Sequence, residues 1–593
     1  MFEQGGETAD RSGRLKESWL RQGGAGYCFD FRSMPTASYR IGLLSDFNVQ
    51  NLAVLLQKNS SPAGLHCVQA PYGQTVPLLL DDKAAFWSES FDTLIIWTLP
   101  HLALPGFQKV LACEPFSMID LLVEVDAFCA LVGRTPERVR TIIIPSFVVP
   151  GVDRGLGALD LSSNVGVANS LMQINLRLAE QLGADRRVVF LDVQRWLRTA
   201  GSDAYSPRLW YLSKTPFQNS VFREAATDIL AALDGIHGRN KKVLVLDLDD
   251  TMWGGVVGDE GWERLRIGGH DPIGEAFVDF QRGLKRLVNR GVLLAIASKN
   301  EESVALEAIR RHPEMVLKIE DFAAWKINWR DKAENITQLM SGLNLGLDSA
   351  VFLDDSPFER ARVKETLPQV FVPDLPADPM DYPSFLGRLR CFDNPVISAE
   401  DRVRTTMYVA DRQRVALKTE GHTLQDWLNL LELRVVVEEL NEANQERAAQ
   451  LLNKTNQMNL STRRMTTPEF VKWSGVAGHR VWTFRIADKF GDYGLCGIVS
   501  LVHEGTRGRL LDFLLSCRVM GRGVEDTMLG VVARQARDLG CEELYAELVP
   551  TPKNQPCVTW FANHPKLRKE GDSFRMPLAE APELPAHVQV SRS

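Results

Sequence analysis

Residues 243–255, VLVLDLDDTMWGG, constrain the fold of this chain more than any other stretch. An apolar run this short is typical of a buried strand in a parallel sheet, and it leads into Asp247 and Asp249. Open α/β sheets bind ligands at the carboxyl ends of such strands. Two neighbouring carboxylates repel each other unless a proton or a cation lies with them, and Mg²⁺ prefers oxygen ligands and phosphates. The run therefore predicts a magnesium-dependent phosphoryl-transfer site in the middle of the chain.

Composition limits the classes to which the protein can belong. A length of 593 residues predicts several domains, and the net charge of -7 argues against a general nucleic-acid surface. The N-terminal residues lack the apolar stretch of a signal peptide, and no run is long enough to span a membrane. The 9 cysteines are scattered, without the spacing of a zinc site. We expect a cytoplasmic protein with reduced thiols that binds neither nucleic acid nor a membrane.

The order of apolar runs predicts an α/β multidomain protein. Residues 1–35 are expected to be a disordered leader, and residues 36–237 and 238–395 alternate strands with helices, as in parallel sheets covered on both faces. Residues 396–575 begin helical and then become rich in strands, and the Pro-rich residues 576–593 are expected to be a frayed tail. Within 238–395 we expect four strands, in the opening run, GVLLAIAS, SAVFLDDS and QVFVPDLP.

Polar residues end or begin successive elements of the central domain. Ser298 ends a predicted strand, where its hydroxyl could hydrogen-bond a phosphoryl oxygen. Lys332 begins a predicted helix, and the strand predicted in SAVFLDDS ends at Asp354 and Asp355, which offer another oxygen ligand to a cation. The segments DLDDT, IASKN with its serine, Lys332 and LDDSPFE together resemble the four motifs of the haloacid dehalogenase (HAD) superfamily.

That resemblance implies a Rossmann-like domain with a covalent mechanism. Asp247 would attack phosphorus, and Asp249 would protonate the leaving oxygen and then activate water. Mg²⁺ would be held by Asp247, Asp249 through its backbone carbonyl, and Asp354. Three residues would bind the phosphate: Thr251, Ser298 and Lys332, with Lys299 and Lys326 as rivals to the last. The short stretch between the first two motifs predicts little or no cap domain, so the open site suits a bulky or protein-borne substrate.

A second motif lies in the C-terminal domain, where LLDFLLSCRVMGRGVED places Arg518, Gly521 and Gly523 between a predicted strand and a helix. Backbone N–H groups at such a helix N-terminus can face an anion. The pattern resembles the pyrophosphate loop of the N-acetyltransferase (GNAT) fold, which implies a GNAT-like α+β domain and a pantetheine site; a plain tight turn is the alternative. Cys517 precedes the loop, where its thiolate would be stabilised, although a core position is more usual; Cys496 is the second candidate thiol.

The N-terminal domain contains YRIGLLSDFNVQNL, with Ser45 where an esterase of the SGNH type has its nucleophile. Such enzymes also need a late catalytic histidine, and none occurs between His101 and His237. We therefore expect a non-catalytic SGNH-hydrolase-like domain with a scaffold or carrier-docking role.

The combination of seven segments closely resembles the FkbH-like glyceryl transferase/phosphatases of polyketide biosynthesis. They are VLDLDDTMWGGVVGDEG, LLAIASKNEE, FAAWKINWRDKAENI, VFLDDSPFER, LLNKTNQMNLSTRR, DKFGDYGL and LLSCRVMGRGVED. The resemblance implies an enzyme that dephosphorylates D-1,3-bisphosphoglycerate and loads the glyceryl group as a thioester onto the phosphopantetheine arm of an acyl carrier protein. Cys517 is then the candidate for a glyceryl-thioester intermediate. A magnesium-dependent phosphatase for another small or carrier-bound phosphate ester is the alternative, and a carrier-docking scaffold without activity is a third possibility.

Overall fold

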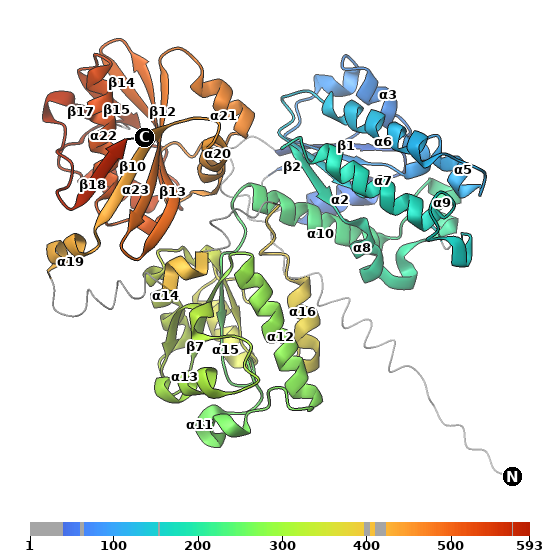
Figure 1. The fold of residues 1–593 in the computed structure, drawn as a ribbon, viewed down its shortest axis with the longest axis horizontal. Coiled ribbons are helices and arrows are strands. Elements are labelled where there is room, and N and C mark those ends of the chain that lie inside the picture. Colours follow the sequence, from blue (N-terminus) through green and yellow to red (C-terminus); the bar gives the residue numbers. More distant parts are fainter. Residues whose placement is uncertain are drawn as a thin grey trace. The chain divides into compact units, whose positions relative to one another are not determined.

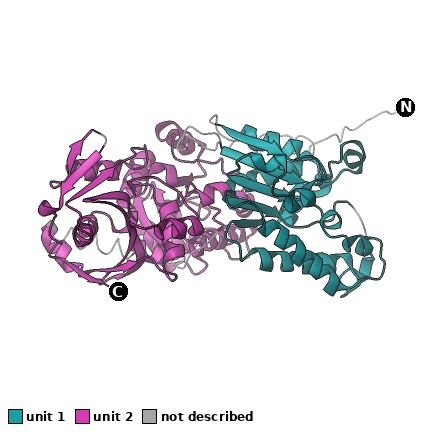
Figure 2. Ribbon diagram, turned by 90° about the horizontal axis from the view of Figure 1, so that it is seen from above, with its two compact units in different colours: residues 1–232 teal, residues 233–593 magenta. Residues whose placement is uncertain are grey.

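The computed structural model describes residues 39–59, 64–151, 155–395, 404–409, 423–571 and 573–592, so the predicted leader lies outside the described residues. The chain divides into two compact units, residues 1–232 and 233–593 (Figure 2). The division falls within helix α10 (Asn219–Ile236), close to the domain limit expected at residue 237. Within the described residues, no helix has the length and apolar character needed to cross a membrane.

The first unit contains a parallel sheet of five strands in the order β2-β1-β3-β4-β5. The strands are β1 (Tyr39–Ser45), β2 (Leu65–Gln69), β3 (Thr93–Trp97), β4 (Thr141–Pro145) and β5 (Val188–Leu191). β3 and β4 are buried at every position because helices cover both faces of the sheet. The helices besides α10 are α2 (Gln50–Asn59), α3 (Thr75–Leu80), α4 (Pro100–Ala103), α5 (Phe107–Leu111), α6 (Met118–Gly133), α7 (Val167–Leu182), α8 (Val193–Ala200) and α9 (Pro207–Ser213).

The second unit begins with a parallel sheet of four strands in the order β8-β7-β6-β9. The strands are β6 (Val243–Leu246), β7 (Leu293–Ser298), β8 (Phe322–Ile327) and β9 (Ala350–Leu353). The helices are α11 (Val257–Glu260), α12 (Pro272–Asn289), α13 (Glu302–Arg311), α14 (Lys332–Gly342), α15 (Pro357–Thr366) and α16 (Tyr382–Arg388) (Figure 1). Because the four strands are parallel, their carboxyl ends meet at one edge of the sheet.

The prediction of one of the four strands expected in this domain is wrong. The segment QVFVPDLP contributes only an isolated bridge between Phe371 and Val351, and β8 is formed instead by FAAWKI. Pro373 and Pro376 lack the N–H groups that a continued ladder requires, whereas FAAWKI contains no proline and pairs along β7.

The C-terminal part of the second unit is built on a largely antiparallel sheet of nine strands. The order is β16-β17-β15-β14-β13-β12-β10-β18, and β11 pairs with β14 beside this path. The strands are β10 (Leu433–Glu439), β11 (Met458–Asn459), β12 (His479–Asp488), β13 (Gly491–Glu504), β14 (Arg507–Leu515), β15 (Glu543–Glu547), β16 (Arg568–Glu570), β17 (Ser573–Pro577) and β18 (Val588–Arg592). The helices are α19 (Leu424–Leu430), α20 (Gln445–Lys454), α21 (Thr467–Ser474), α22 (Val524–Asp538) and α23 (Gln555–Asn563).

The predicted frayed tail, residues 576–593, is instead part of this domain as far as residue 592. β18 pairs in parallel with β10, and Val588 is buried beside Leu433. Pro582 and Pro585 lie in the connection between β17 and β18, so they remove no donor from the β18 ladder.

The short strand β11 fills a gap between two neighbouring strands. β14 and β15 pair in parallel only as far as Leu510 and Ala546. β11 then pairs with the end of β14. The N–H of Leu460 donates to the carbonyl of Phe513 at 3.3 Å, and the N–H of Val549 donates to the carbonyl of Leu460 at 3.0 Å. The chain thus inserts its own backbone where the two strands separate.

Candidate active site

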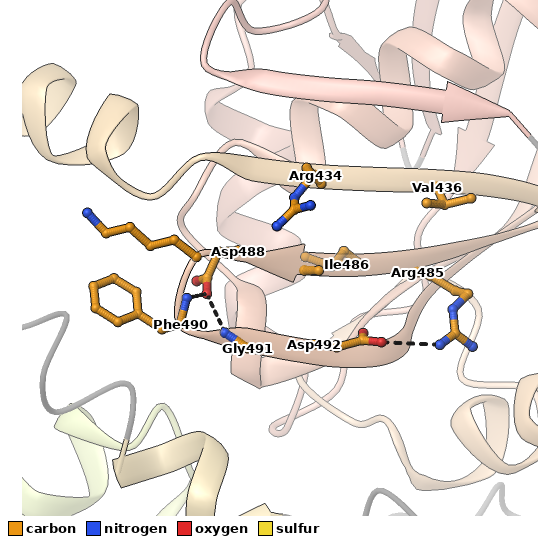
Figure 3. Close-up of a pocket in the computed structure, with 10 residues that line it drawn as sticks. Arg434, Val436, Arg485, Ile486, Asp488, Phe490, Gly491 and Asp492 are labelled. Carbon is orange, nitrogen blue, oxygen red and sulfur yellow. Dashed lines mark hydrogen bonds and ion pairs between the residues drawn. The ribbon is translucent and has the colours of Figure 1, made fainter.

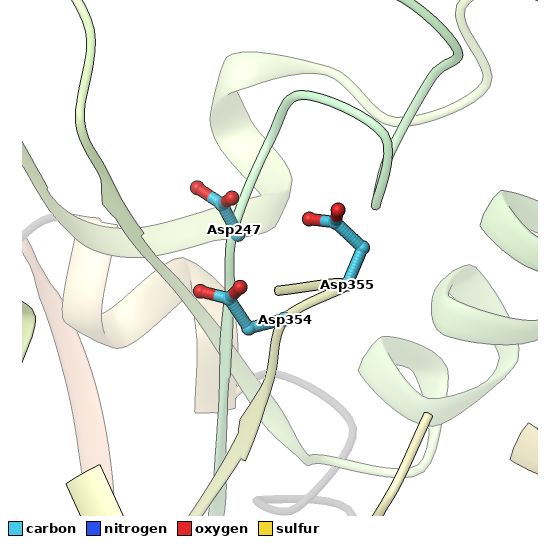
Figure 4. Close-up of side chains that lie close together, drawn as sticks. All are labelled: Asp247, Asp354 and Asp355. Atoms are coloured by element: carbon cyan, nitrogen blue, oxygen red, sulfur yellow. The ribbon is translucent and has the colours of Figure 1, made fainter. Parts of the chain in front are cut away.

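The predicted polar residues of the central domain come together at one edge of its sheet. Asp247 follows β6 directly, Asp354 follows β9, Ser298 ends β7, and Lys332 begins α14 after β8. Figure 4 shows the side chains of Asp247, Asp354 and Asp355 close together at the ends of the two neighbouring strands. This arrangement arises because parallel strands deliver the residues that follow them to the same place.

Lys332 is the lysine of this site. Its ammonium lies 2.6 Å from Oδ2 of Asp354 and 3.0 Å from Oδ2 of Asp247, and the residue is only 3% exposed. Burial lowers the pKa of Lys332, but the two carboxylates outweigh that effect, so the net direction is upward and the ammonium stays charged. Its rival Lys299 donates instead to Glu359 at 2.6 Å.

The carboxylates fit a divalent cation. Oxygens of Asp247, Asp354 and Asp355 lie within 4.8 Å of one another, and Oδ1 of Asp247 is buried without a hydrogen-bond partner among the described residues. Burial and the charge of Asp247 raise the pKa of Asp354 to about 6, despite the opposing effect of Lys332. Three acids facing one ammonium leave excess negative charge, and an all-oxygen set is the kind that Mg²⁺ prefers. A cation here would satisfy the orphaned oxygen and reduce the repulsion.

The side chain of Asp249 is not a member of this cluster, in contrast to Asp355. Its Oδ1 accepts from the indole N–H of Trp253 at 2.9 Å and from the N–H of Val257 at 3.1 Å, and its Oδ2 accepts from the amide of Asn300 at 2.7 Å. Burial raises the pKa of Asp249, and these hydrogen bonds counteract only part of the rise. A carboxyl group held this way, with a raised pKa, suits proton transfer.

Thr251 and Ser298 are both buried in the site, but Thr251 is engaged with the protein. Its hydroxyl donates to Oδ1 of Asp355 at 3.3 Å and accepts from the N–H of Asp355 at 3.1 Å. In the structure it therefore positions an acid, and contact with phosphate remains a prediction. Ser298 is 1% exposed in the chain, and its carbonyl accepts from the N–H of Asn328 at 3.0 Å.

Two supporting residues were missed by sequence reasoning. Asn300 donates to Asp249, and Arg360 donates through one nitrogen to the carbonyls of Asp354 and Asp355 at 2.7 and 2.6 Å. Asn300 lies two residues after Ser298 in IASKN, so its closeness to the site could have been inferred. Arg360 reaches back from α15 to the chain that precedes it, and no spacing rule predicts such a contact.

Between β6 and α12 the chain forms α11, a single turn at Trp262–Arg264 and isolated bridges such as that between Gly254 and Arg266. This insertion is too small for a cap domain, in agreement with the expectation from motif spacing. The carboxyl edge of the sheet is therefore not enclosed by that connection.

The predicted thiol site lies at the end of β14. Cys517 is partly buried against the core of the four-stranded parallel sheet, 3.7 Å from the hydroxyl of Tyr408. Burial lowers the pKa of the half-buried Lys242. Cys496, the second candidate, is fully buried and donates to the carbonyl of Tyr493, as expected for a core residue.

The glycine loop that follows Cys517 is occupied by intramolecular contacts. The N–H of Gly521 donates to the buried carboxylate of Glu525 at 2.8 Å, and Arg518 is buried, with Nε donating to Ser516. Gly523 has a φ of +79°, and a Cβ there would lie 2.8 Å from the ring of His587. The glycine is thus required by the turn itself, and an incoming anion would have to displace Glu525.

Two cavities lie elsewhere in the described residues. One, of about 340 Å³, is lined by Ser45, Gln69 and Lys214 among others, with no histidine in its lining. Ser45 is buried, and its Oγ accepts from the N–H of Phe47 at 3.2 Å. The other, of about 460 Å³, lies along β10 and the β12–β13 hairpin, where Arg485 pairs with Asp492 at 3.4 Å (Figure 3).

Comparison with known proteins supports the phosphatase interpretation of the central domain. No family model matches the chain, and no curated protein matches it either. A crystal structure of the N-terminal part of the protein BF1531 from Bacteroides fragilis, containing a phosphatase domain complexed with Mg, is similar at 30% identity and a TM-score of 0.56. The match covers 61% of this chain and 96% of that one.

Two acetyltransferase structures are similar over a smaller part of the chain. Spermidine N-acetyltransferase from Vibrio cholerae, in complex with CoA and spermine, has 13% identity and a TM-score of 0.21, covering 25% of this chain and 97% of that one. An acetyltransferase of the GNAT family from Staphylococcus aureus Mu50 has 12% identity and a TM-score of 0.20, covering 24% and 99%. The substantial likeness is to BF1531: the chain belongs to the same family, and its central domain is a phosphatase domain of the haloacid dehalogenase type.

Proposed function

We propose that the protein is a glyceryl transferase/phosphatase that removes both phosphates from D-1,3-bisphosphoglycerate and loads the glyceryl group onto an acyl carrier protein. The observation that carries the proposal is the presence, in one compact unit, of a complete acid and lysine set at the phosphatase edge and of a partly buried thiol, Cys517, beside Tyr408. The substrate has two phosphates of different chemistry, an activated acyl phosphate and an inert monoester, which call for two different nucleophiles.

The monoester is assigned to Asp247. Its carboxylate attacks phosphorus, the bond from phosphorus to the glyceryl oxygen breaks, and Asp249 donates the proton that the leaving oxygen needs. Asp249, now a carboxylate, takes a proton from water, which attacks the aspartyl-phosphate and releases inorganic phosphate from Asp247. Lys332 holds Asp247 in place at 3.0 Å. Mg²⁺, held by Asp247, Asp354 and Asp355, would supply positive charge against the charge that develops on the phosphoryl group.

The acyl phosphate is assigned to Cys517. Its thiolate attacks the carbonyl carbon, the carbon–oxygen bond to phosphate breaks, and phosphate leaves with the electron pair. The resulting thioester is then attacked by the pantetheine thiol of the carrier, which releases Cys517 with its sulfur unchanged. The loop with Arg518, Gly521 and Gly523 is the proposed pantetheine site, next to the thiol.

A second candidate function is that of a magnesium-dependent phosphatase acting on another small or carrier-bound phosphate ester. The contacts of the glycine loop favour it, because Glu525 already accepts from the N–H of Gly521 and Arg518 is buried. In that case the C-terminal domain would not take part in acyl transfer.

Intact-mass analysis of a holo carrier protein distinguishes the two functions. The carrier is incubated with enzyme, Mg²⁺ and freshly generated 1,3-bisphosphoglycerate. A glyceryl mass shift without phosphate supports acyl transfer with dephosphorylation, and an unchanged carrier mass with phosphate release supports the second candidate. Cys517→Ala should abolish loading, whereas Asp247→Asn should leave a phosphoglyceryl group on the carrier. A covalent glyceryl-enzyme trapped in Cys517→Ala would refute the assignment of the thiol.

A further inference from the structure

The cavity along β10 and the β12–β13 hairpin is lined by more basic groups than acidic ones (Figure 3). Its volume of about 460 Å³ lies within the range of sites that hold small molecules. The basic residues of its lining are Arg434 of β10, Arg485 of β12 and Lys489 of the turn between β12 and β13. The acidic residues are Asp488 and Asp492. Whether the cavity attracts an anion depends on which of these charges are already balanced by the protein itself.

The carboxylate of Asp488 is fully engaged, although it lines the cavity. Asp488 is only 3% exposed, and its Oδ1 accepts from the N–H groups of Phe490 at 2.9 Å and Gly491 at 3.2 Å. Its Oδ2 accepts from the hydroxyl of Tyr493 at 3.0 Å and lies 3.6 Å from Nη1 of Arg522. Asp488 therefore holds the turn of the hairpin, and its charge is balanced by an arginine outside the cavity lining.

The second acid, Asp492, balances one basic group of the lining. Its Oδ1 accepts from the N–H of Gly494 at 2.7 Å, and its Oδ2 lies 3.4 Å from Arg485. Among the described residues, neither Arg434 nor Lys489 forms an ion pair, and the ammonium of Lys489 lies 5.1 Å from the centre of the Phe490 ring. Three basic groups less the one that Asp492 balances leave two positive charges of the lining without an acid.

The two arginines of the lining lie on the same face of the sheet. Arg434 of β10 is opposite Ala487 of β12, and Arg485 is opposite Val436, so the arginines are diagonal neighbours across the two strands. Like charges on neighbouring strands repel each other. A guanidinium group binds phosphate oxygens through two parallel hydrogen bonds. A phosphate group between the arginines would therefore remove the repulsion and use both sets of donors.

The rest of the lining is apolar and firmly held. Val436 and Phe490 form part of the wall, and the backbone of the Phe490 turn is fixed by Asp488. The ring of Phe490 packs against a buried apolar cluster, which consists of Trp427, Leu428 and Leu431. A site held in this way loses little entropy when it binds a ligand. Its two halves match a molecule that has a phosphate at one end and a carbon skeleton at the other.

We propose that this cavity binds a small phosphorylated molecule with at least two negative charges. Its phosphate lies between Arg434 and Arg485, and its carbon skeleton contacts Val436 and Phe490. Lys489 adds a positive charge at the turn. None of these residues belongs to the phosphatase edge or to the glycine loop after Cys517, so the site does not depend on the proposed function. Binding there requires no covalent step.

The test measures binding of inorganic pyrophosphate and phenyl phosphate to the full chain by isothermal titration calorimetry. The protein is free of metal ions, so the three acids of the phosphatase edge repel both probes, and the buffer contains no phosphate. Arg434→Gln, Arg485→Gln and the double variant are compared with Arg480→Gln, which changes an exposed arginine of the same strand outside the lining. We expect about 10-fold weaker binding in each single variant, about 100-fold in the double variant and a change within about twofold in the control.

Two further measurements locate the site and check its chemistry. Bound pyrophosphate should slow hydrogen exchange in peptides that cover residues 485–492. Arg434→Lys, which keeps the charge but loses the paired donors, should bind with an affinity between those of wild type and Arg434→Gln. Equal melting temperatures of all variants would show that the affinities compare folded proteins.

Four results would overturn the proposal. Neither probe binds the wild type, or both bind the double variant as tightly as the wild type, which would place the anion elsewhere. An equal loss in Arg480→Gln would show an effect of net charge rather than of this cavity. A short glutamate peptide tests the other class of occupant, an acidic segment of a protein. If that peptide binds more tightly than both probes and loses its affinity in the double variant, the cavity recognises a protein and not a small phosphorylated molecule.

Discussion

Replacing Lys332 by methionine tests the electrostatic balance of the phosphatase site. The substitution removes an ammonium that lies 3.0 Å from Asp247 and 2.6 Å from Asp354. Removing one partner of a buried ion pair destabilises a protein by about 3–5 kcal/mol, because the other charge is left without compensation. Lys332 is only 3% exposed, so solvent screens the pair little. We expect a loss in this range in metal-free protein at a pH of about 8, together with loss of phosphatase activity.

The loss should become smaller as the pH falls, and the sign follows from Asp354. Its pKa is about 6 in the wild type and 3.8 in the unfolded chain, and Lys332 opposes the rise. Without Lys332 the folded pKa rises further. Above pH 6, Asp354 is then protonated in the folded variant but ionised in the unfolded chain and in the folded wild type. The stability of the variant therefore falls by about 1.4 kcal/mol per pH unit as the pH rises. At a pH near 6 we expect a residual loss of about 1–2 kcal/mol.

Hydrogen exchange of β6 and β9 peptides, corrected for intrinsic rates, measures this difference locally in a chain of several domains. A loss of about 3 kcal/mol corresponds to roughly 150-fold faster exchange. Lys332→Arg, which keeps the charge, is the control and should lose less protection. Equal losses at both pH values would refute the coupling between Lys332 and Asp354.

Three further predictions concern the metal site and the C-terminal domain. Burial and the charge of Asp247 raise the pKa of Asp354 from 3.8 to about 6, so the stability of the metal-free protein should fall as the pH rises through that interval. Mg²⁺ should therefore raise the melting temperature more at pH 8 than at pH 5. An equal rise at both pH values would contradict this prediction. Asp512 is fully buried and binds Arg463, Ser461 and Ser500. Asp512→Ala should therefore destabilise the C-terminal domain by about 3–5 kcal/mol, measured by calorimetry. A loss below about 1 kcal/mol would show that water takes the place of the carboxylate. Val588→Asp should lower the free energy of unfolding of the C-terminal domain by about 1–3 kcal/mol, because it places a charge in the β18–β10 pair. An unchanged melting temperature would instead support the prediction that this segment is a frayed tail.

Much of the fold could be predicted from apolar runs that end in polar residues. Strands β6, β7 and β9 are short, wholly buried runs, so their type and direction follow from the sequence. The edge strand β2, LHCVQ, escaped notice because it is mostly half-buried and mixes polar with apolar residues. The strand predicted for QVFVPDLP was wrong because its apolar residues suggest a strand, whereas its prolines prevent a continuous ladder of hydrogen bonds.

The positions of the candidate site residues could be predicted from the sequence more fully than their side-chain contacts. Asp247, Ser298, Lys332 and Asp354 each adjoin the end of a strand or the start of a helix, and topology alone brings such positions together. The engagement of Thr251 with Asp355, and of Gly521 with Glu525, depends on side-chain directions within tight loops, which periodicity does not describe. For the same reason the sequence could place the glycine loop but not show that its N–H is already satisfied.

The insertion of β11 between β14 and β15 has a consequence for how the C-terminal domain acquires its structure. Leu460 joins Phe513 and Val549 through backbone hydrogen bonds, although these residues are distant in the chain. Loops of that length close slowly, so the final sheet should form late, and until then two strand edges with unpaired N–H and C=O groups are open to other molecules. A fragment that begins after residue 460 would expose these edges permanently and should aggregate. During synthesis, residues 458–460 emerge before both of the strands that they join. The unpaired backbone groups of these strand edges are therefore covered only when the last strands of the sheet have been made.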